Sequence, residues 1–205
     1  MLFRSIEFLT KEEDKKMYGN VESISGRLSA IMKTLLVKRL ESSFFAFTQS
    51  LSRFQKAIDN MLGMFDDNRV FIAPDLDINK LLEEGLSYDE IEAKINEKGG
   101  NNKEYKKDAF DKKFVDLLKQ DKEKVDGLIE RWSKVKKDPK LIEFAKQIQE
   151  EFFKPNQNNS GKLIIFSESK ETAEELTSKL SKITKKKVLT VRSEEHTSEL
   201  QSPNT

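Results

Sequence analysis

Between residues 21 and 65 the hydrophobic positions recur with the spacing of an α-helix. The strongest run alternates steps of four and three residues, through Leu40, Phe44, Phe47, Leu51, Phe54, Ile58, Met61 and Phe65. Such a 3.5-residue repeat is typical of a helix that packs along another helix. An earlier run keeps the same repeat up to a one-residue slip near Val37, through Ile24, Leu28, Ile31 and Leu35. The pattern predicts one helix of about 65 Å or two helices placed end to end.

The middle of the chain has a weaker pattern. It predicts a turn at residues 66–68 and a short extended segment at residues 70–73, directly before Pro74. A helix is expected over residues 78–95, ending at the glycines and asparagines of residues 99–102.

A second amphipathic helix is predicted from Phe110 to about Lys136, because its apolar residues again share one face. Asp138 followed by Pro139 is typical of an N-cap and first helical position, so a further helix is expected to run to Phe152 or Phe153.

The pattern changes after Lys162. Residues 163–166 are continuously apolar, as expected of a parallel strand buried on both faces. Ser167 or Ser169 is placed to cap a helix, and residues 188–191 predict a second strand. The inward face of that helix is expected to carry Ala173, Leu176 and Leu180. The expected fold class is mainly α with a C-terminal βαβ, whose parallel sheet continues in further strands.

Composition narrows the classes of function. The 37 basic residues nearly cancel the 36 acidic ones, so no overall basic charge indicates a nucleic-acid partner. The absence of cysteine excludes disulfides and thiolate metal sites, and His196 is the single histidine. No apolar stretch is long enough to span a membrane and no signal peptide is evident, so a cytoplasmic protein is expected.

Both ends of the chain resemble translated sequencing adapter. The resemblance covers residues 1–5 and residues 192–205, which we treat as non-native and leave out of fold reasoning. The alternative for residues 192–205 is an ordinary polar terminus, and either reading predicts disorder there. On the adapter reading, the native reading frame extends beyond this chain on both sides.

No complete catalytic site is evident. Gly161-Lys162 lacks the further glycines and the Ser or Thr of a phosphate loop. Residues 89–92, Asp-Glu-Ile-Glu, are similar to a magnesium-binding acidic box, but their neighbours predict a surface helix. Phe44, Phe45 and Phe47 could stack on bases, although their spacing favours core packing. We therefore assign no catalytic residue, no metal ligand and no cofactor to this segment.

Two stretches together resemble bacterial Snf2-related DNA helicases, which belong to superfamily 2. Residues 35–54 contain the run Lys38, Arg39, Leu40, Glu41, Ser42 and Ser43, which resembles a segment between the two RecA-like lobes of these helicases. Residues 138–141, 162–169 and 172–176 resemble the entry to the second lobe, including helicase motif IV. The resemblance implies a helical inter-lobe region at residues 6–137 and the start of the C-terminal RecA-like lobe at residues 138–191.

The resemblance implies that the parent protein is an ATP hydrolase that moves along DNA, with ATP and magnesium bound by parts outside this segment. Ser167, Ser169 and Lys170 become candidate DNA contacts, although the serines could equally be helix caps. The inter-lobe motif comprises Lys38, Arg39, Glu41, Ser42 and Ser43, of which Lys38, Arg39 and Glu41 are expected at a junction between helix and lobe. There an ion-pair network is favoured over direct DNA contact.

Two other interpretations stay open. The chain could be a non-enzymatic helical interaction module that pairs through the Leu40 to Phe65 positions, with the βαβ as a small appended domain. It could also be a free-standing α/β enzyme, which would need a closed sheet that this sequence lacks. On the leading interpretation its partners are DNA and the remaining helicase lobes, with no membrane.

Overall fold

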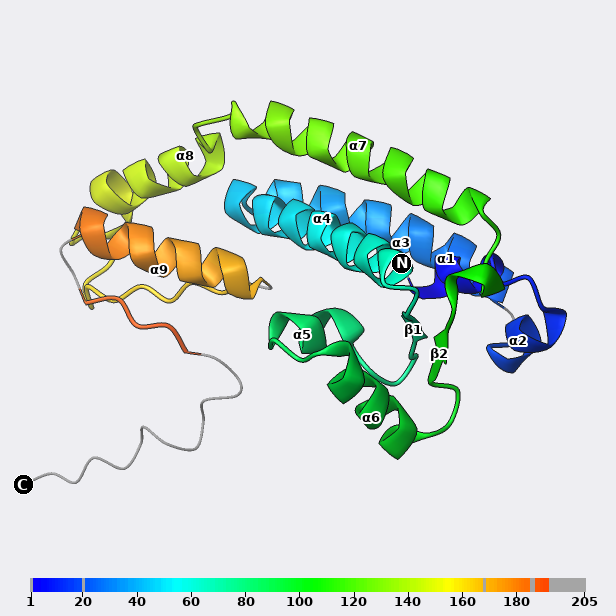
Figure 1. Ribbon diagram of the computed structural model, residues 1–205. Helices are drawn as coiled ribbons and strands as arrows, with labels where there is room; N and C mark the ends of the chain where they lie inside the picture. Colours follow the sequence, from blue (N-terminus) through cyan, green and yellow to red (C-terminus); the bar gives the residue numbers. More distant parts are fainter. Residues whose placement is uncertain (1, 20, 168, 185–186, 192–205) are drawn as a thin grey trace, which may run out of the picture. The chain divides into compact units, whose positions relative to one another are not determined.

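The computed structural model describes residues 2–19, 21–167, 169–184 and 187–191. It is mainly α-helical, as predicted (Figure 1). The helices are α1 (Leu2–Glu7), α2 (Glu12–Met17), α3 (Val21–Ser42), α4 (Phe44–Asp66), α5 (Ile78–Glu83), α6 (Tyr88–Lys98), α7 (Lys113–Ser133), α8 (Pro139–Gln147) and α9 (Lys170–Thr184). The strands are β1 (Val70–Ile72) and β2 (Lys103–Tyr105); a 3₁₀ turn spans Lys107–Ala109 and a π-helical turn Ile148–Phe152.

The chain divides into two compact units. Unit 1 comprises Met1–Lys38 and Ser50–Lys134, and unit 2 comprises Arg39–Gln49 and the chain from Val135 onward. None of the helices in the described ranges combines the length and apolarity needed to cross a membrane.

The helical region over residues 21–65 is two helices, not one. Ser43 lies between them: its N–H donates to the Arg39 carbonyl at 3.0 Å, and its carbonyl accepts from the Phe47 N–H at 3.1 Å. Its hydroxyl also accepts from the Ala46 N–H at 3.2 Å, as an N-cap does. Ser43 therefore ends α3 and begins α4, and the chain turns there (Figure 1).

The predicted packing positions differ between these two helices. Along α4, the buried side chains of the predicted run are Phe47, Leu51, Ile58, Met61 and Phe65, while Phe44, Phe45 and Phe54 are half-buried. On α3, Ile31 and Leu35 are 52% and 47% exposed, so the packing predicted there is absent. The side chains of Ile24 and Leu28 lie outside the description.

The core of unit 1 forms where α4, β1, α6 and α7 meet. Its most completely buried large side chains include Phe71, Ile91, Phe114 and Leu118. The Phe114 ring stacks on Phe8 at 4.8 Å between centroids and meets Phe65 edge-on at 5.6 Å. Burial of this kind is the main force that stabilises a domain of this size.

Strand β1 confirms the extended segment predicted at residues 70–73, and β2 is an element that the sequence did not reveal. The two pair antiparallel, with Phe71 opposite Glu104. The turn before β1 uses Asn68 at φ 56°, a left-handed conformation that asparagine tolerates. The Asn68 side chain accepts from the Lys107 N–H at 2.9 Å, which ties this turn to the segment after β2.

The helix expected over residues 78–95 is interrupted. Helix α5 ends at Glu83, Gly85 adopts φ 86°, and Ser87 then begins α6 through a capping box with Glu90. The interruption lets Ile78 and Ile91, from two different helices, enter the same core.

The predicted N-cap of unit 2 is confirmed. The Asp138 carboxylate accepts from the N–H groups of Lys140 and Leu141 at 2.9 and 3.1 Å, with Pro139 at the first helical position. Helix α8 continues into the π-helical turn, so helical structure reaches Phe152 as expected. Ser169 caps α9 by accepting from the Thr172 N–H at 3.3 Å, and Leu180 is buried.

The strands of the predicted βαβ are not formed, although its helix is. Residues 163–166 and 188–191 belong to no sheet in the described part of the chain. Ile164 is 77% exposed, Phe166 92% and Leu189 73%, whereas the prediction expected burial on both faces. A parallel strand exists only through its hydrogen-bonded neighbours, so an apolar run alone does not produce one.

The ends can be described only in part. Leu2 to Ser5 belong to α1, and Ser5 is buried beside the core residue Ile6. The assignment of residues 1–5 to adapter stays a prediction. Residues 192–205, expected to be adapter-derived and disordered, lie outside the described residues.

Candidate functional site

Three of the inter-lobe residues predicted from the sequence, Arg39, Ser42 and Ser43, contact helix α9 within unit 2. The Arg39 guanidinium lies 2.9 Å from the Glu171 carboxylate, and the Ser43 hydroxyl donates to Glu175 at 2.7 Å. Between these two contacts, the Ser42 hydroxyl lies 3.2 Å from that of Thr172. Residues 130 or more positions apart in sequence thus form a junction at the end of α3, which we call the α3–α9 junction.

Glu171 connects this junction to the turn that precedes α9. Its Oε2 atom accepts from Arg39 Nη1 and also from the Ser169 hydroxyl, each at 2.9 Å. The Glu171 side chain is 13% exposed and that of Arg39 is 35% exposed, so the ion pair is partly shielded from water.

Asp138 adds a second connection to the same segment. One of its carboxylate oxygens caps α8, while the other accepts from the Phe44 N–H at 3.0 Å, at the start of α4. The Lys140 ammonium donates to the Glu41 carbonyl at 3.0 Å. The start of α8 therefore holds the turn between α3 and α4 at two backbone groups, the Phe44 N–H and the Glu41 carbonyl, through the Asp138 carboxylate and the Lys140 ammonium.

The five predicted inter-lobe residues differ in what they contribute to the α3–α9 junction. Arg39, Ser42 and Ser43 enter the junction through their side chains, and of Lys38, Arg39 and Glu41, for which an ion-pair network was favoured, Arg39 forms an ion pair there. Glu41 contributes its carbonyl, and its side chain is exposed. Lys38 is exposed and makes no hydrogen bond or ion pair within the described residues.

Of the three candidate DNA contacts, Ser167 and Ser169 precede α9 and Lys170 is its first residue. Ser167 and Lys170 are exposed, whereas Ser169 is half-buried and already caps the helix. The Ser167 hydroxyl accepts from the Ser169 N–H at 3.2 Å, which orders the turn. Sequence reasoning missed Glu171 as the partner of Arg39, because nothing in the local pattern links positions 132 residues apart.

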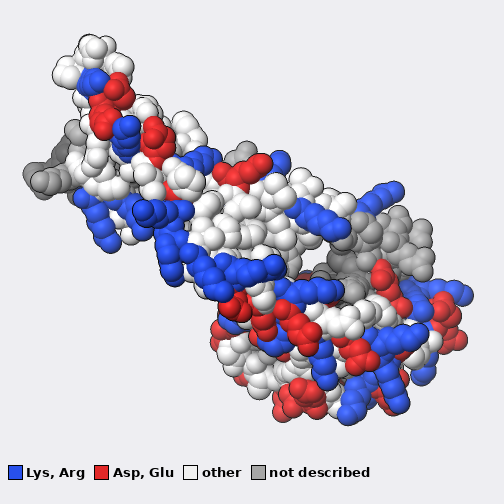
Figure 2. All heavy atoms as spheres, turned by 90° about the horizontal axis from the view of Figure 1, so that it is seen from above, with Lys and Arg blue, Asp and Glu red and all other residues white. Residues whose placement is uncertain are grey.

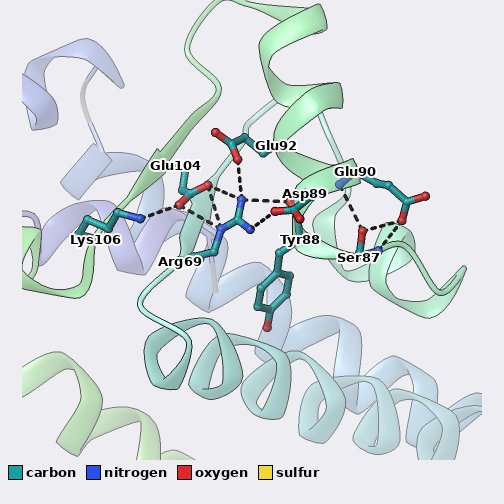
Figure 3. Close-up of polar contacts among 8 residues, drawn as sticks. All are labelled: Arg69, Ser87, Tyr88, Asp89, Glu90, Glu92, Glu104 and Lys106. Carbon is teal, nitrogen blue, oxygen red and sulfur yellow. Dashed lines mark hydrogen bonds and ion pairs between the residues drawn. The ribbon is translucent and has the colours of Figure 1, made fainter.

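A second polar cluster, centred on Arg69, lies in unit 1 (Figure 3). Its guanidinium contacts Asp89, Glu92 at 2.6 Å and Glu104 at 3.0 Å. It also lies over the rings of Phe71 and Tyr88, 5.7 and 6.0 Å from their centroids. One arginine thereby joins the start of β1 to α6 and β2, which is a structural role.

The Arg69 cluster explains the role of the acidic residues at positions 89–92, which are similar in sequence to a magnesium-binding box. Asp89 and Glu92 lie on α6 and face Arg69, while Glu90 accepts hydrogen bonds from Ser87 (Figure 3). Residues 89–92 are therefore the first turn of a surface helix, as the favoured interpretation had it. No group of three His, Asp or Glu side chains in the described part of the chain is arranged to hold a metal ion.

Contacts within the Arg69 cluster shift the pKa values of Glu104 and Arg69. Burial opposes ionisation of Glu104, but hydrogen bonds from Arg69 and Lys106 outweigh it and hold the pKa of Glu104 below its usual range. Hydrogen bonds to Glu104 and Asp89 raise the pKa of Arg69 further. Arg69 and Glu104 are consequently both charged at neutral pH.

Two tyrosines form another polar contact inside unit 1. The hydroxyls of Tyr18 and Tyr105 lie 3.2 Å apart, and the Tyr105 hydroxyl donates to Asp14 at 3.3 Å. Burial raises the pKa of both phenols, so both are neutral at physiological pH. The contact tethers α2 to β2.

An open hollow of about 220 Å³ also lies in unit 1, between α4, the end of β1 and the start of α5. Its lining is largely apolar, with Met61, Phe71 and Leu76 among it. The one ionisable side chain in the lining is Asp77, which caps α5 by accepting from the Lys80 N–H.

Basic and acidic side chains are mixed on one face of the molecule. On the face drawn in Figure 2, Lys and Arg side chains are interspersed with Asp and Glu. This agrees with the near-equal totals of basic and acidic residues.

Comparison with known proteins found no matching family model, no matching curated protein and no matching solved structure.

Proposed function

We propose that this chain is part of an ATP-driven DNA translocase or helicase of the Snf2 type, supplying inter-lobe helices and the beginning of the second lobe. The supporting observation is the α3–α9 junction. The stretches that carry the resemblance contact each other: Ser42 and Ser43, within residues 35–54, meet residues 172–176, and the Phe44 N–H donates to Asp138, within residues 138–141.

Such a junction suits the proposed role. A two-lobe motor changes the relation between its lobes as ATP is bound and hydrolysed, and the connecting helices must be fixed to the lobe that they move. Arg39 and Ser43 would fix α3 to the first helix of the second lobe. ATP and magnesium would be held by other parts of the parent protein, which would work in the cytoplasm.

On this proposal the turn before α9 lies along the DNA. Ser167 and Lys170 are exposed and can reach phosphate oxygens, whereas Ser169 serves mainly to fix the turn. The exposed apolar residues 163–166 and 188–191 would be covered by neighbouring strands of the complete lobe.

The most direct test is the sequence of the gene around this segment. A glycine-rich phosphate loop should be encoded upstream and an arginine-bearing motif downstream. If the full gene encodes neither, the proposal is wrong.

A biochemical test uses the chain itself. We expect no ATP hydrolysis by the purified chain, with or without DNA, because it carries no phosphate loop. Hydrolysis that DNA stimulates, in a preparation free of contaminating ATPase, would contradict this.

A second candidate function is a helical interaction module. It is favoured by α3, where Ile31, Met32, Leu35 and Val37 are all at least 38% exposed. The positions first considered for pairing run from Leu40 to Phe65, and most of them are buried within this chain. If the chain is an interaction module, a variant with Ile31→Glu and Leu35→Glu should lose self-association or partner binding. If it is part of a DNA translocase or helicase, the same variant should leave the DNA-dependent activity of the full protein intact.

A further inference from the structure

Helix α9 is attached to the rest of unit 2 mainly through side chains. In the described part of residues 153–169, which connect the π-helical turn to α9, there is no helix or strand. Residues 163–166 within that connection are exposed. The position of α9 therefore depends on its own tertiary contacts rather than on a rigid connection.

The contacting side chains form matched faces on the two helices. Arg39, Ser42 and Ser43 stand at positions i, i+3 and i+4 at the end of α3, which is one face of a helix. Their partners on α9, Glu171, Thr172 and Glu175, likewise lie on one face of its first two turns. Thr172 is 8% exposed and Ser43 is 5% exposed. Water is therefore largely excluded from the hydrogen bonds that their hydroxyl groups form with Ser42 and Glu175.

We infer that the Arg39–Glu171 ion pair is a salt-sensitive latch that keeps α9 docked on the end of α3. Opening the latch releases α9 and, with it, the turn at Ser169. The inference rests on contacts within unit 2 and does not depend on the proposed function.

Glu171 gives the latch its second effect. The same Oε2 atom accepts from Arg39 and from the Ser169 hydroxyl, so the two donors share one charge. When the ion pair with Arg39 breaks, the Glu171 side chain can rotate. The Ser169 hydroxyl, which caps α9, then loses its hydrogen-bond acceptor on Glu171. Any ligand that draws Ser169 away from Glu171 would in turn weaken the hold of Arg39, because such coupling is reciprocal.

Charge reversal tests the latch in the full chain. Arg39→Glu would bring a third carboxylate beside Glu171 and Glu175, and Glu171→Arg would face Arg39 with a second guanidinium. We expect each change to speed hydrogen exchange of the α9 backbone by about fivefold or more. The double variant, R39E with E171R, restores an opposite-charge pair and should return the rates to within about twofold of the original.

Lys38→Glu is the matched control. It makes the same change in charge one residue away, at an exposed side chain without a polar contact among the described residues. Its α9 exchange should equal that of the unchanged chain. If Arg39→Glu behaves like Lys38→Glu, or if the double variant exchanges as fast as the single variants, the latch is refuted.

Salt provides an independent measurement that needs no charge reversal. Raising the ionic strength from 0.01 to 1 M shortens the Debye length from about 30 to about 3 Å and should speed α9 exchange in the unchanged chain. Arg39→Gln removes the ion pair and should abolish most of this salt dependence. Equal salt dependence in both proteins would overturn the inference.

Discussion

Different kinds of contact stabilise the inside of unit 1 and the inside of unit 2. Unit 1 has a contiguous apolar core that includes Phe71, Ile91 and Phe114, and its one large ionic cluster lies beside that core. Among the described residues of unit 2 the buried apolar side chains are few, namely Ala46, Phe47, Ile148 and Leu180. Polar contacts there join residues far apart in sequence, Arg39 to Glu171 and Ser43 to Glu175.

The difference indicates which region can change shape. A packed apolar core resists small displacements, whereas polar contacts exchange readily with water, salt or ligand. Unit 1 is therefore suited to a scaffold, and the α3–α9 junction to a movable connection. Four sets of variants test this contrast, from the largest expected effect to the smallest.

Truncating the aromatic core should have the largest effect. Phe114→Ala should lower the free energy of unfolding of unit 1 by about 3–5 kcal/mol, because Phe114 is fully buried against Phe8 and Phe65. Urea unfolding monitored by the fluorescence of Trp132, the single tryptophan, measures this. The control Phe166→Ala, at a 92% exposed position in unit 2, should change stability by less than about 0.5 kcal/mol. Similar losses for both variants would contradict the contrast between the units.

Removing the arginine of the ionic cluster should be next in size. Arg69→Met leaves Asp89, Glu92 and Glu104 without their shared cation and should lower the stability of unit 1 by about 2–3 kcal/mol. Lys56→Met is the control, because its ion pair with Glu83 is about half exposed and contributes at most about 0.5 kcal/mol. An Arg69→Met protein as stable as the control would show that the cluster has no structural role.

Removing the cap at Ser43 tests the junction without altering charge. Ser43→Ala loses a hydrogen bond to Glu175 and the N-cap of α4, so unit 2 should lose about 1–2 kcal/mol. Hydrogen exchange of residues 39–49 measures this loss locally. Ser52→Ala, at an exposed position inside α4, should be neutral or slightly stabilising, since alanine favours helix. Unchanged exchange in Ser43→Ala would mean that Ser43 does not hold the turn.

The pH dependence of Glu104 should give the smallest effect. Its pKa is lower in the folded chain than in the unfolded one, so its stabilising contribution is present above the unfolded value and lost as pH falls through the folded value. Glu104→Gln should therefore be less stable at pH 7, by about 1 kcal/mol, and should approach the unchanged chain in acid. Denaturant unfolding at pH 7 and pH 3 checks this, with the exposed Glu97→Gln as control. A difference in stability between Glu104→Gln and the unchanged chain that grew as the pH fell would contradict this prediction.

Local signals in the sequence predicted local structure well. The 3.5-residue repeat identified Leu51, Ile58, Met61 and Phe65 as core positions, and all four are buried. Asp138 was predicted as a helix cap and is one; Ser167 or Ser169 was predicted to cap the last helix, and Ser169 does so. In each case the deciding contacts lie within a few residues of one another.

Predictions that depended on distant partners did less well. Strand β2 is polar in sequence and forms because β1 pairs with it and Arg69 holds Glu104. Residues 163–166 have a strand-like sequence but no described neighbour to pair with. Ile31 and Leu35 follow the helical repeat but are exposed. A repeat shows that residues share one face of a helix, but it does not show which other element packs on that face. The partners of Arg39 and Ser43 were missed for the same reason.

The most direct test of the central claim joins the two halves of the α3–α9 junction covalently. The chain has no cysteine, so a variant with Ser42→Cys and Thr172→Cys would contain one possible disulfide. Because the replaced hydroxyls lie 3.2 Å apart, mild oxidation should link these positions rapidly and nearly completely, as the mass and gel mobility of the protein would show. A variant pairing Ser42→Cys with Ser178→Cys, at an exposed position of α9, should link slowly. Equally slow linkage of both pairs would contradict the junction and, with it, the main structural support for the proposed function.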